Sequence, residues 1–359
     1  MNVLLLGASG VIGRRVAAEL IRQGGLDKLT LAGRHADELE HLAGLLRGSV
    51  QVEVDAFDLL VGDPASHFAG HGVVISCAGP GYLLEERSVD AALSAGTDYV
   101  SLNDDAQPAA AIRERDHEAK QRGVTIVSGC GLAPGISSLL IAHASEGFDK
   151  VQEIEVSVAG SSSDAGGPAT DLHFVAMFDQ PSANGRMARS AQPVYFPDPV
   201  GWVETFTCEH PEDLAVRAAH PSLEAFRFRA GLAEKAVMDS VRAGVAVRLG
   251  ATEKRRRLWL KGARPLRPLL EIMSPGAAAW TALRIDARGL SEGRTKTTSY
   301  AVVDRLVNLA SIPLVQAVRS LPSAGKGVVP ADQLERPADM LKKIAARGVR
   351  FGELEPHTL

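Results

Sequence analysis

Short apolar runs and helical segments alternate along the first 135 residues. The runs are short enough to be buried strands, and they read VLLL, LTLAG, VQVEV, VVISCA, DYVSL and VTIVSG. The segments between them carry helical periodicity, as in RRVAAELIRQ at 14–23. This alternation predicts an α/β fold whose core is a Rossmann-type doubly wound parallel sheet, with the carboxyl ends of all strands on one edge. The residues expected at that edge are Gly7, Gly33, Cys77, Asn103 and Gly129.

After residue 135 the pattern changes to longer strands with alternating polar and apolar positions. VQEIEVSVAG, FRFRAG, LRIDARG and TTSYAVV are typical of antiparallel strands, and they predict a second, mixed α+β domain over 136–325. The stretches GSSSDAGGPATD and QPVYFPDPVGW have the composition of loops. The C-terminal part, from VDRLVNLASIPLVQAVRSL to ADMLKKIAARG, is helical again and could pack on the first domain. Within it, the segment 326–359 is predicted to return to the Rossmann domain at 1–135.

The composition and net charge limit the kinds of binding partner that are expected. A net charge of -4 over 359 residues offers no general attraction to nucleic acid, so a small-molecule substrate is expected. The three cysteines are too widely spaced for a disulfide framework or a metal pair, which favours a cytoplasmic protein without a metal site. No apolar stretch is long enough to span a bilayer, and the first residues lack the features of a signal peptide.

The stretch GASGVIG at 7–13 directly follows the first predicted strand and opens a helix. Glycines at this spacing allow a tight turn, close approach of the backbone to a pyrophosphate, and close packing of helix on strand. The amide groups at the helix N-terminus favour an anion. The pattern therefore predicts a dinucleotide site, with a tight turn that binds no ligand as the alternative. Its candidate residues are Gly7, Ser9, Gly10, Val11, Ile12 and Gly13.

The end of the second strand indicates which nucleotide binds. NAD sites usually place a carboxylate there, whereas this strand ends in LAGRH, with Arg34 and His35 at that point. A guanidinium can hold a 2′-phosphate through two hydrogen bonds, while a carboxylate would repel it. We therefore predict NADP(H), with Arg34 as the main phosphate contact and His35 beside it. A solvated strand end is the alternative.

The short-chain dehydrogenases share a similar glycine spelling, but they need a tyrosine with a lysine four residues later. None of the four tyrosines meets this requirement: the residues at that offset are Glu86, Asn103, Pro199 and Asp304. Short-chain dehydrogenase chemistry is therefore excluded.

The chain instead resembles the saccharopine dehydrogenase-like family, in the form whose NADP-binding domain opens the protein. The resemblance is carried by GASGVIGRRVAAELI, LAGRHADELEHLA, VVISCAGPGYLLEERSVDAALSAGTDYVSLNDD, VSGCGLAPGISSLL and the tail GVVPADQLERPADMLKKIAARGVRF. It implies that the C-terminal segment joins the nucleotide-binding domain and that the middle domain binds substrate and forms a homodimer. It also implies reduction of an imine made from an amine and a carbonyl compound, although distant members are enoyl reductases.

The resemblance also implies roles for particular residues. Cys77, Ala78, Gly79 and Pro80 should run beside the pyrophosphate and the nicotinamide riboside. Asn103 and Asp104 are expected to face the nicotinamide or the substrate, with a helix cap as the alternative role.

The second domain offers candidate acids and anion ligands. His173 is our candidate for a general acid or substrate ligand, and a structural histidine is the alternative. The arginines available for a substrate carboxylate are Arg186, Arg189, Arg227 and Arg229.

Two further features have simpler interpretations. Cys130 is interpreted as a small core residue and not as a nucleophile. The basic run at 253–267 is interpreted as a solvated surface, with an anionic membrane or an acidic carrier protein as alternatives.

Three functions remain open from the sequence. The first is NADPH-dependent reduction of an imine, or the reverse oxidation, with Asp104 and His173 as catalytic candidates. The second is reduction of an enoyl C=C bond in a carrier- or lipid-linked substrate. The third is a non-catalytic NADP(H)-binding scaffold or sensor.

Overall fold

The computed structural model describes residues 1–48, 50–164, 166–179, 190–263 and 279–355. The chain divides into two compact units. The first combines Met1–Leu139 with Val307–Arg347, and the second combines Leu140–Leu306 with the stretch that begins at Gly348. No helix in the described ranges combines the length and the apolar character needed to cross a membrane.

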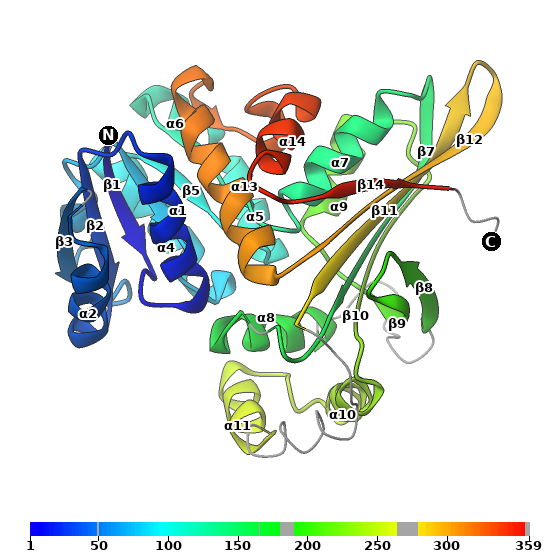
Figure 1. Cartoon of the computed structure of the whole chain (residues 1–359), viewed down its shortest axis with the longest axis horizontal. Coiled ribbons are helices and arrows are strands. Elements are labelled where there is room, and N and C mark those ends of the chain that lie inside the picture. The colour runs from blue at the N-terminus through cyan, green and yellow to red at the C-terminus, as the bar shows by residue number, and fades with distance from the viewer. Residues whose placement is uncertain (49, 165, 180–189, 264–278, 356–359) are drawn as a thin grey trace. The chain divides into compact units, whose positions relative to one another are not determined.

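The first unit is built on a seven-stranded sheet in the order β13-β6-β5-β4-β1-β2-β3 (Figure 1). All neighbouring strands in it are parallel. Its strands are β1 (Asn2–Leu6), β2 (Lys28–Gly33), β3 (Gln51–Ala56), β4 (Val73–Ser76), β5 (Asp98–Ser101), β6 (Thr125–Val127) and β13 (Gly327–Val328). The predicted fold class is confirmed, because the strands are parallel and helices connect them.

Strand β1, in the middle of the sheet, is almost entirely apolar because both faces of the sheet are covered. Val3, Leu4, Leu5 and Leu6 of β1 are all buried, as expected for a strand in the middle of a parallel sheet. The helices of this unit are α1 (Val11–Gln23), α2 (Ala36–Leu46), α3 (Pro64–Phe68), α4 (Gly81–Ala95), α5 (Ala106–Glu114), α6 (Asp116–Arg122), α13 (Leu306–Ser320) and α14 (Pro337–Ala345). Short 3-10 turns occupy Leu321–Ser323 and Ala331–Gln333, and α7 (Ile136–Ser145) leads into the second unit.

The second unit is built on a mixed seven-stranded sheet in the order β14-β12-β11-β7-β10-β9-β8. Its strands are β7 (Lys150–Gly160), β8 (Gln192–Phe196), β9 (Gly201–Cys208), β10 (Ala225–Leu232), β11 (Thr281–Ser291), β12 (Arg294–Asp304) and β14 (Phe351–Leu354). Its helices are α8 (Pro168–Asp179), α9 (Glu212–Ala219), α10 (Lys235–Ala246) and α11 (Glu253–Ala263). The predicted mixed domain is therefore present.

Two details of the second sheet differ from the prediction. β10 pairs with β7 in parallel, because α8, β8, β9 and α9 lie between them and return the chain in the same direction. The stretch QPVYFPDPVGW is not a loop but the hairpin of β8 and β9. Its prolines are compatible with this, since Pro193 lies on the outermost strand and Pro199 lies in the connection.

The chain path also differs from the predicted ranges at two points. Helix α13 belongs to the first unit, which fits the expected packing of the C-terminal helices on that domain, although the helix lies before the predicted boundary at residue 326. Most of its residues are buried, and Arg15 of α1 donates from Nε to the side-chain oxygen of Asn308 at 3.0 Å. Strand β14, which lies within the predicted C-terminal segment, pairs with β12 of the second unit. The roles expected for these regions stay predictions.

A buried carboxylate fastens α1 to the end of α14. Glu19 is fully buried and accepts hydrogen bonds from Arg22, from Gln23 at 2.7 Å and from Arg347 at 2.8 Å. Burial alone would raise the pKa of Glu19, but the hydrogen bonds from Gln23, Arg22 and Arg347 outweigh it and hold the pKa below its usual value. The segment after residue 326 is therefore tied to the first helix of the chain.

Candidate functional site

The loop between β1 and α1 has a shape that only glycine permits. Gly7 has a φ of +70°, and a Cβ there would lie 2.8 Å from the carbonyl oxygen of Cys77. A Cβ on Gly13 would lie 2.1 Å from the carbonyl oxygen of Gly7. The first contact brings the loop against the end of β4, and the second brings helix α1 down onto the loop. The geometry therefore requires glycine at both positions, as expected for a dinucleotide-binding turn.

The N-terminus of α1 is open to an anion. The N-cap residue is Gly10, which has no side chain to cap the helix, and the first turn carries no acidic residue. Gly10 and Val11 are exposed. The first amide groups of a helix lack partners within the helix, and the helix dipole adds to their attraction for negative charge. These features fit the pyrophosphate of a dinucleotide at residues 7–13.

Arg34 and His35 are exposed immediately after β2. Gly33 ends the strand, and His35 is the N-cap residue of α2. Within the described part of the chain, the ion pairs do not include Arg34. The nearest acidic residues in sequence, Asp37 and Glu38, lie in the first turn of α2 and not at the strand end. The arginine is therefore placed where the ribose of a bound dinucleotide is expected in this fold.

The residues after β4 form a small, apolar turn. Cys77 and Ala78 touch the position that a Cβ on Gly7 would take, and the Gly79–Pro80 peptide bond is cis. Burial raises the pKa of the Cys77 thiol to about 12. This thiol is therefore neutral at physiological pH and would not repel a phosphate nearby.

The loop after β5 packs against the start of α4. The backbone amide of Tyr82 donates to Oδ2 of Asp105 at 2.7 Å. A Cβ on Gly81 would lie 2.2 Å from Oδ1 of Asn103. The N-cap residue of α5 is Asp105, and neither Asn103 nor Asp104 takes that position. Asp105 thus supplies the carboxylate at the N-terminus of α4, while the N-terminus of α1 stays open.

Asn103 is held by hydrogen bonds within its own loop. It is 5% exposed, its Nδ2 donates to Oγ of Ser128 at 3.3 Å, and its Oδ1 accepts from the amide of Asp105 at 3.3 Å. The residue lies at the predicted edge of the sheet with a fixed orientation. Its contact with nicotinamide or substrate stays a prediction.

A buried carboxylate, which the sequence analysis missed, lies beneath this edge. Glu85 of α4 is 2% exposed and accepts hydrogen bonds from Tyr99 at 2.9 Å, from Ser128 at 3.0 Å and from Ser101. Burial raises its pKa to about 6, against the lowering effect of the three hydroxyl groups. Ser128 also accepts from Asn103. The network therefore links the interior of the sheet to the loop after β5.

The sequence contains only a weak signal for this network. The spacing of helix α4 would place Glu85 next to Ser88 and Val89, which are buried, and not on the solvated face. Its partners come from β5 and β6, and their proximity follows from strand order, which periodicity does not reveal. Cys130, in the loop after β6, is 1% exposed. Burial raises the pKa of its thiol, so its interpretation as a core residue fits the structure.

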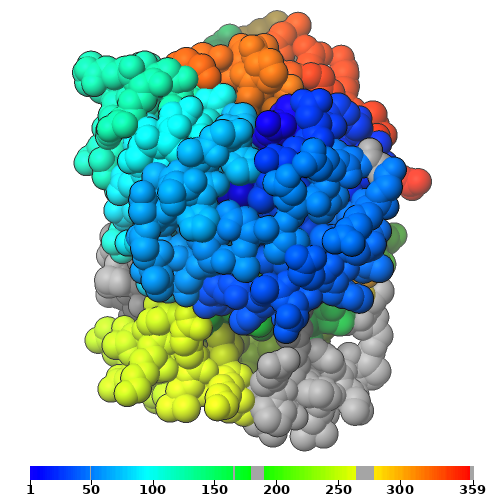
Figure 2. Space-filling view, turned by 90° about the vertical axis from the view of Figure 1, so that its left-hand side faces the viewer, coloured from blue at the N-terminus to red at the C-terminus, as the bar shows by residue number. Residues whose placement is uncertain are grey.

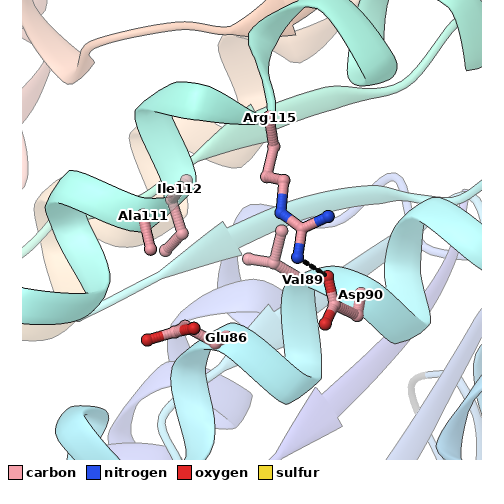
Figure 3. A pocket seen from close by; sticks show the side chains of 6 residues that line it. All are labelled: Glu86, Val89, Asp90, Ala111, Ile112 and Arg115. Atoms are coloured by element: carbon pink, nitrogen blue, oxygen red, sulfur yellow. Dashed lines mark ion pairs between the residues drawn. The ribbon is translucent and has the colours of Figure 1, made fainter.

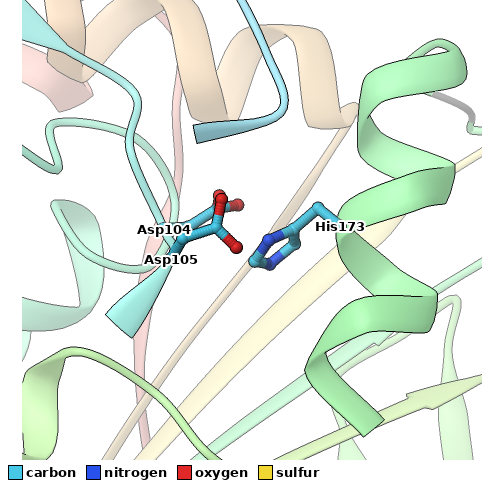
Figure 4. Close-up of side chains that lie close together, drawn as sticks. All are labelled: Asp104, Asp105 and His173. Atoms are coloured by element: carbon cyan, nitrogen blue, oxygen red, sulfur yellow. The ribbon is translucent and has the colours of Figure 1, made fainter. Parts of the chain in front are cut away.

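The two catalytic candidates come from different units. Asp104 lies between β5 and α5 in the first unit, and His173 lies on α8 in the second (Figure 4). Both side chains are partly exposed. Their participation in one reaction stays a prediction.

The candidate arginines of the second unit differ in their environments. Arg229 is 4% exposed and donates to Thr205 at 3.1 Å, to Thr207 at 3.2 Å and to the carbonyl oxygen of Ser190. Its guanidinium therefore holds β9 and β10 together. Arg227 is exposed and pairs with Glu153 at 3.1 Å. Arg186 and Arg189 lie outside the described residues.

A small recess lies between α4 and α5 (Figure 3). Its volume of about 10 Å³ matches a single water molecule and not a substrate. Arg115 pairs with Asp90 across it at 3.0 Å. The remaining lining residues are Glu86, Val89, Ala111 and Ile112. We therefore do not assign this recess to substrate binding.

The parallel sheet, the glycine loop and the open N-terminus of α1 define a Rossmann-type dinucleotide-binding domain, the kind that nicotinamide-dependent oxidoreductases use. Residues 3–127 match the saccharopine dehydrogenase NADP binding domain. This match supports, for the N-terminal part of the chain, the family resemblance that the motifs in the sequence indicated.

Solved structures that share the fold include two that align over nearly the whole chain. Apo saccharopine dehydrogenase (L-Glu forming) from Saccharomyces cerevisiae has a TM-score of 0.69 and 17% identity, over 99% of this chain and 100% of that chain. Homospermidine synthase from Legionella pneumophila, in complex with NAD, has a TM-score of 0.60 and 11% identity, over 99% of this chain and 91% of that chain. At these identities the likeness concerns the fold, and it extends through both units.

Proposed function

We propose that this protein is an NADPH-dependent oxidoreductase that reduces an imine, formed from an amine and a carbonyl compound or keto acid, or that catalyses the reverse oxidation. The observation that carries the proposal is the glycine loop with an open α1 N-terminus next to a β2 end that bears Arg34 instead of a carboxylate. The substrate class is supported by the family of residues 3–127 and by the names of the two related folds, a saccharopine dehydrogenase and a homospermidine synthase.

The residues proposed to bind the cofactor lie at the ends of four strands, β1, β2, β4 and β5. Residues 7–13 would hold the pyrophosphate through backbone amides, and Arg34 and His35 would hold the 2′-phosphate. The turn at 77–80 and the side chain of Asn103 would border the nicotinamide end. When bound, the cofactor supplies the hydride, so the chain has to position the substrate and control its proton.

The proposed reaction requires little covalent chemistry from the protein itself. The imine carbon accepts a hydride, and the imine nitrogen must carry a proton. Because this nitrogen comes from the substrate amine, it can retain a proton of that amine. Asp104 and His173 are the groups that we propose for holding or supplying this proton. The substrate is a small molecule, free or carrier-linked, and a homodimer is the proposed assembly.

The test is turnover of the purified chain, followed by loss of NADPH absorbance. We expect consumption of NADPH with an amine and a keto acid together, no consumption with either alone, and slower consumption with NADH. A secondary amine product, identified by mass spectrometry, completes the test. Turnover with an enoyl thioester, but not with amine and keto acid, would overturn the imine proposal in favour of C=C reduction. Tight NADPH binding without turnover on any of these substrates would support a sensor instead.

A further inference from the structure

Helix α11 has two clearly different faces. Its sequence EKRRRLWLKGA contains five cations and one carboxylate. Arg256, Trp259, Leu260 and Ala263 are partly buried and fall on one side of the helix at the spacing of 3.6 residues per turn. The opposite side carries five exposed residues: Lys254, Arg255, Arg257, Leu258 and Lys261.

The inner face fixes the orientation of the helix. The ring of Trp259 lies against Gly244 of α10, where a Cβ would come within 2.1 Å of it. Arg256 donates from Nη1 to the carbonyl oxygen of Gly250 at 3.3 Å and pairs with Glu253 at 3.5 Å. Because these contacts occupy the inner side, the outer side is presented to solvent.

The outer face combines positive charge with exposed aliphatic side chains. Leu258 is 70% exposed and lies among the four cations. At the end of α10 and in the turn after it, Val247 and Leu249 are also exposed, at 68% and 40%. Figure 2 shows α11 in yellow-green on the molecular surface. A helix that combines lysine and arginine with exposed aliphatic side chains has the composition of helices that lie on a membrane surface.

We propose that the outer face of α11 binds an anionic lipid surface, with the cations at the headgroups and Leu258 in the layer beneath them. Lysine and arginine stems can cover apolar surface while their charges stay at the headgroups. The whole chain has a net charge of -4, so attraction to a negative surface has to come from a local patch. An acidic protein would satisfy the charge, but it would not by itself account for three exposed aliphatic side chains.

The experiment is co-sedimentation of the full chain with phosphatidylcholine vesicles, prepared with and without phosphatidylserine. We expect binding only to vesicles that contain phosphatidylserine, and weaker binding as salt rises. The double variant Arg255→Gln/Lys261→Gln should weaken binding by about 25-fold, at about fivefold per cation near an anionic surface. Leu258→Ser should weaken it by about tenfold, through loss of one buried aliphatic side chain.

The matched control removes two charges elsewhere. Lys235 and Lys342 have side chains that are 73% and 79% exposed, so Lys235→Gln/Lys342→Gln lowers the net charge equally without touching α11. This control should bind phosphatidylserine vesicles as the unmodified chain does. The proposal is overturned if the unmodified chain does not sediment with these vesicles. That result is the one expected if α11 binds an acidic protein and not a lipid surface. It is also overturned if the control loses as much affinity as the α11 variants.

Discussion

The buried carboxylate of Glu85 makes a quantitative prediction about stability. The variant Glu85→Gln removes the ionisable group but keeps the shape of the side chain. The amide oxygen can still accept from Ser101 and Ser128, and the amide nitrogen can face the hydroxyl of Tyr99. Any pH dependence that the wild type shows and the variant lacks therefore belongs to this carboxyl group.

The sign follows from the direction of the pKa shift. Burial raises the pKa of Glu85 in the folded chain from 4.5 to about 6. Below about pH 4.5 the group is protonated in both states, and its contribution to stability is fully present. Between about pH 4.5 and 6 the unfolded chain releases this proton more readily than the folded chain, so stability falls as pH rises. The shift corresponds to about 2 kcal/mol, which we expect the wild type to lose relative to Glu85→Gln.

The assay has to report on the first unit. All three tryptophans, Trp202, Trp259 and Trp280, lie in the second unit, so their fluorescence would miss the effect. Hydrogen exchange of peptides from α4 and β5, measured by mass spectrometry along urea titrations, gives the free energy of unfolding locally. Tryptophan fluorescence in the same titrations serves as the internal control and should be the same in both proteins.

The reasoning is refuted by either of two results. One is a difference between wild type and Glu85→Gln that stays constant from about pH 4.5 to above 6. The other is a wild type that gains stability relative to the variant as pH rises, which would mean that the hydroxyl hydrogen bonds outweigh burial.

Two further predictions concern charged residues of the first unit. Arg34→Ala should weaken NADPH binding by about tenfold or more, which is the value of a charge-assisted hydrogen bond. It should leave NADH binding nearly unchanged. Calorimetric titrations measure both affinities, and equal affinity of variant and wild type for NADPH would contradict the prediction. Glu19→Gln should destabilise the first unit by about 1–2 kcal/mol at neutral pH, a value reduced from that of a fully buried pair because Arg22 is half exposed. Since the folded pKa of Glu19 is lowered, this difference should disappear as pH falls through that pKa, opposite to Glu85. Hydrogen exchange of α1 and α14 peptides measures it, and a difference that persists in acid would contradict the assignment.

The first unit was predictable because its signals are local. VLLL followed by GASGVIG identifies a buried strand and a turn that needs glycine, and the structure shows the steric reasons at Gly7 and Gly13. The later hairpin of β8 and β9 was not predictable in the same way. The prolines give this segment the composition of a loop. Pro193 is acceptable in a strand only because β8 lies at the outside of the sheet.

Among the residues of the candidate site, too, those with local signals were predictable and those that depend on distant partners were not. Strand ends place Arg34, Cys77 and Asn103 at one edge of the sheet, and this follows from the parallel order alone. Glu85 was missed because its partners come from two other strands. The parallel pairing of β7 with β10 was missed for a related reason, since strand direction depends on the intervening path and not on the strands' own residues.

The late position of β13 in the chain has a consequence for protein synthesis. Thr125, at the start of β6, bonds through its hydroxyl to Gly325, which is 200 residues later, and β13 follows directly and pairs with β6. At ribosomal rates of about 5–20 residues per second, the nascent first unit would wait about 10–40 s for this neighbour. During that interval the outer edge of β6 would lack its strand, and such an edge is a site of aggregation and chaperone binding. Pausing or truncation between residues 139 and 307 would therefore leave a nearly complete nucleotide-binding sheet with one open side.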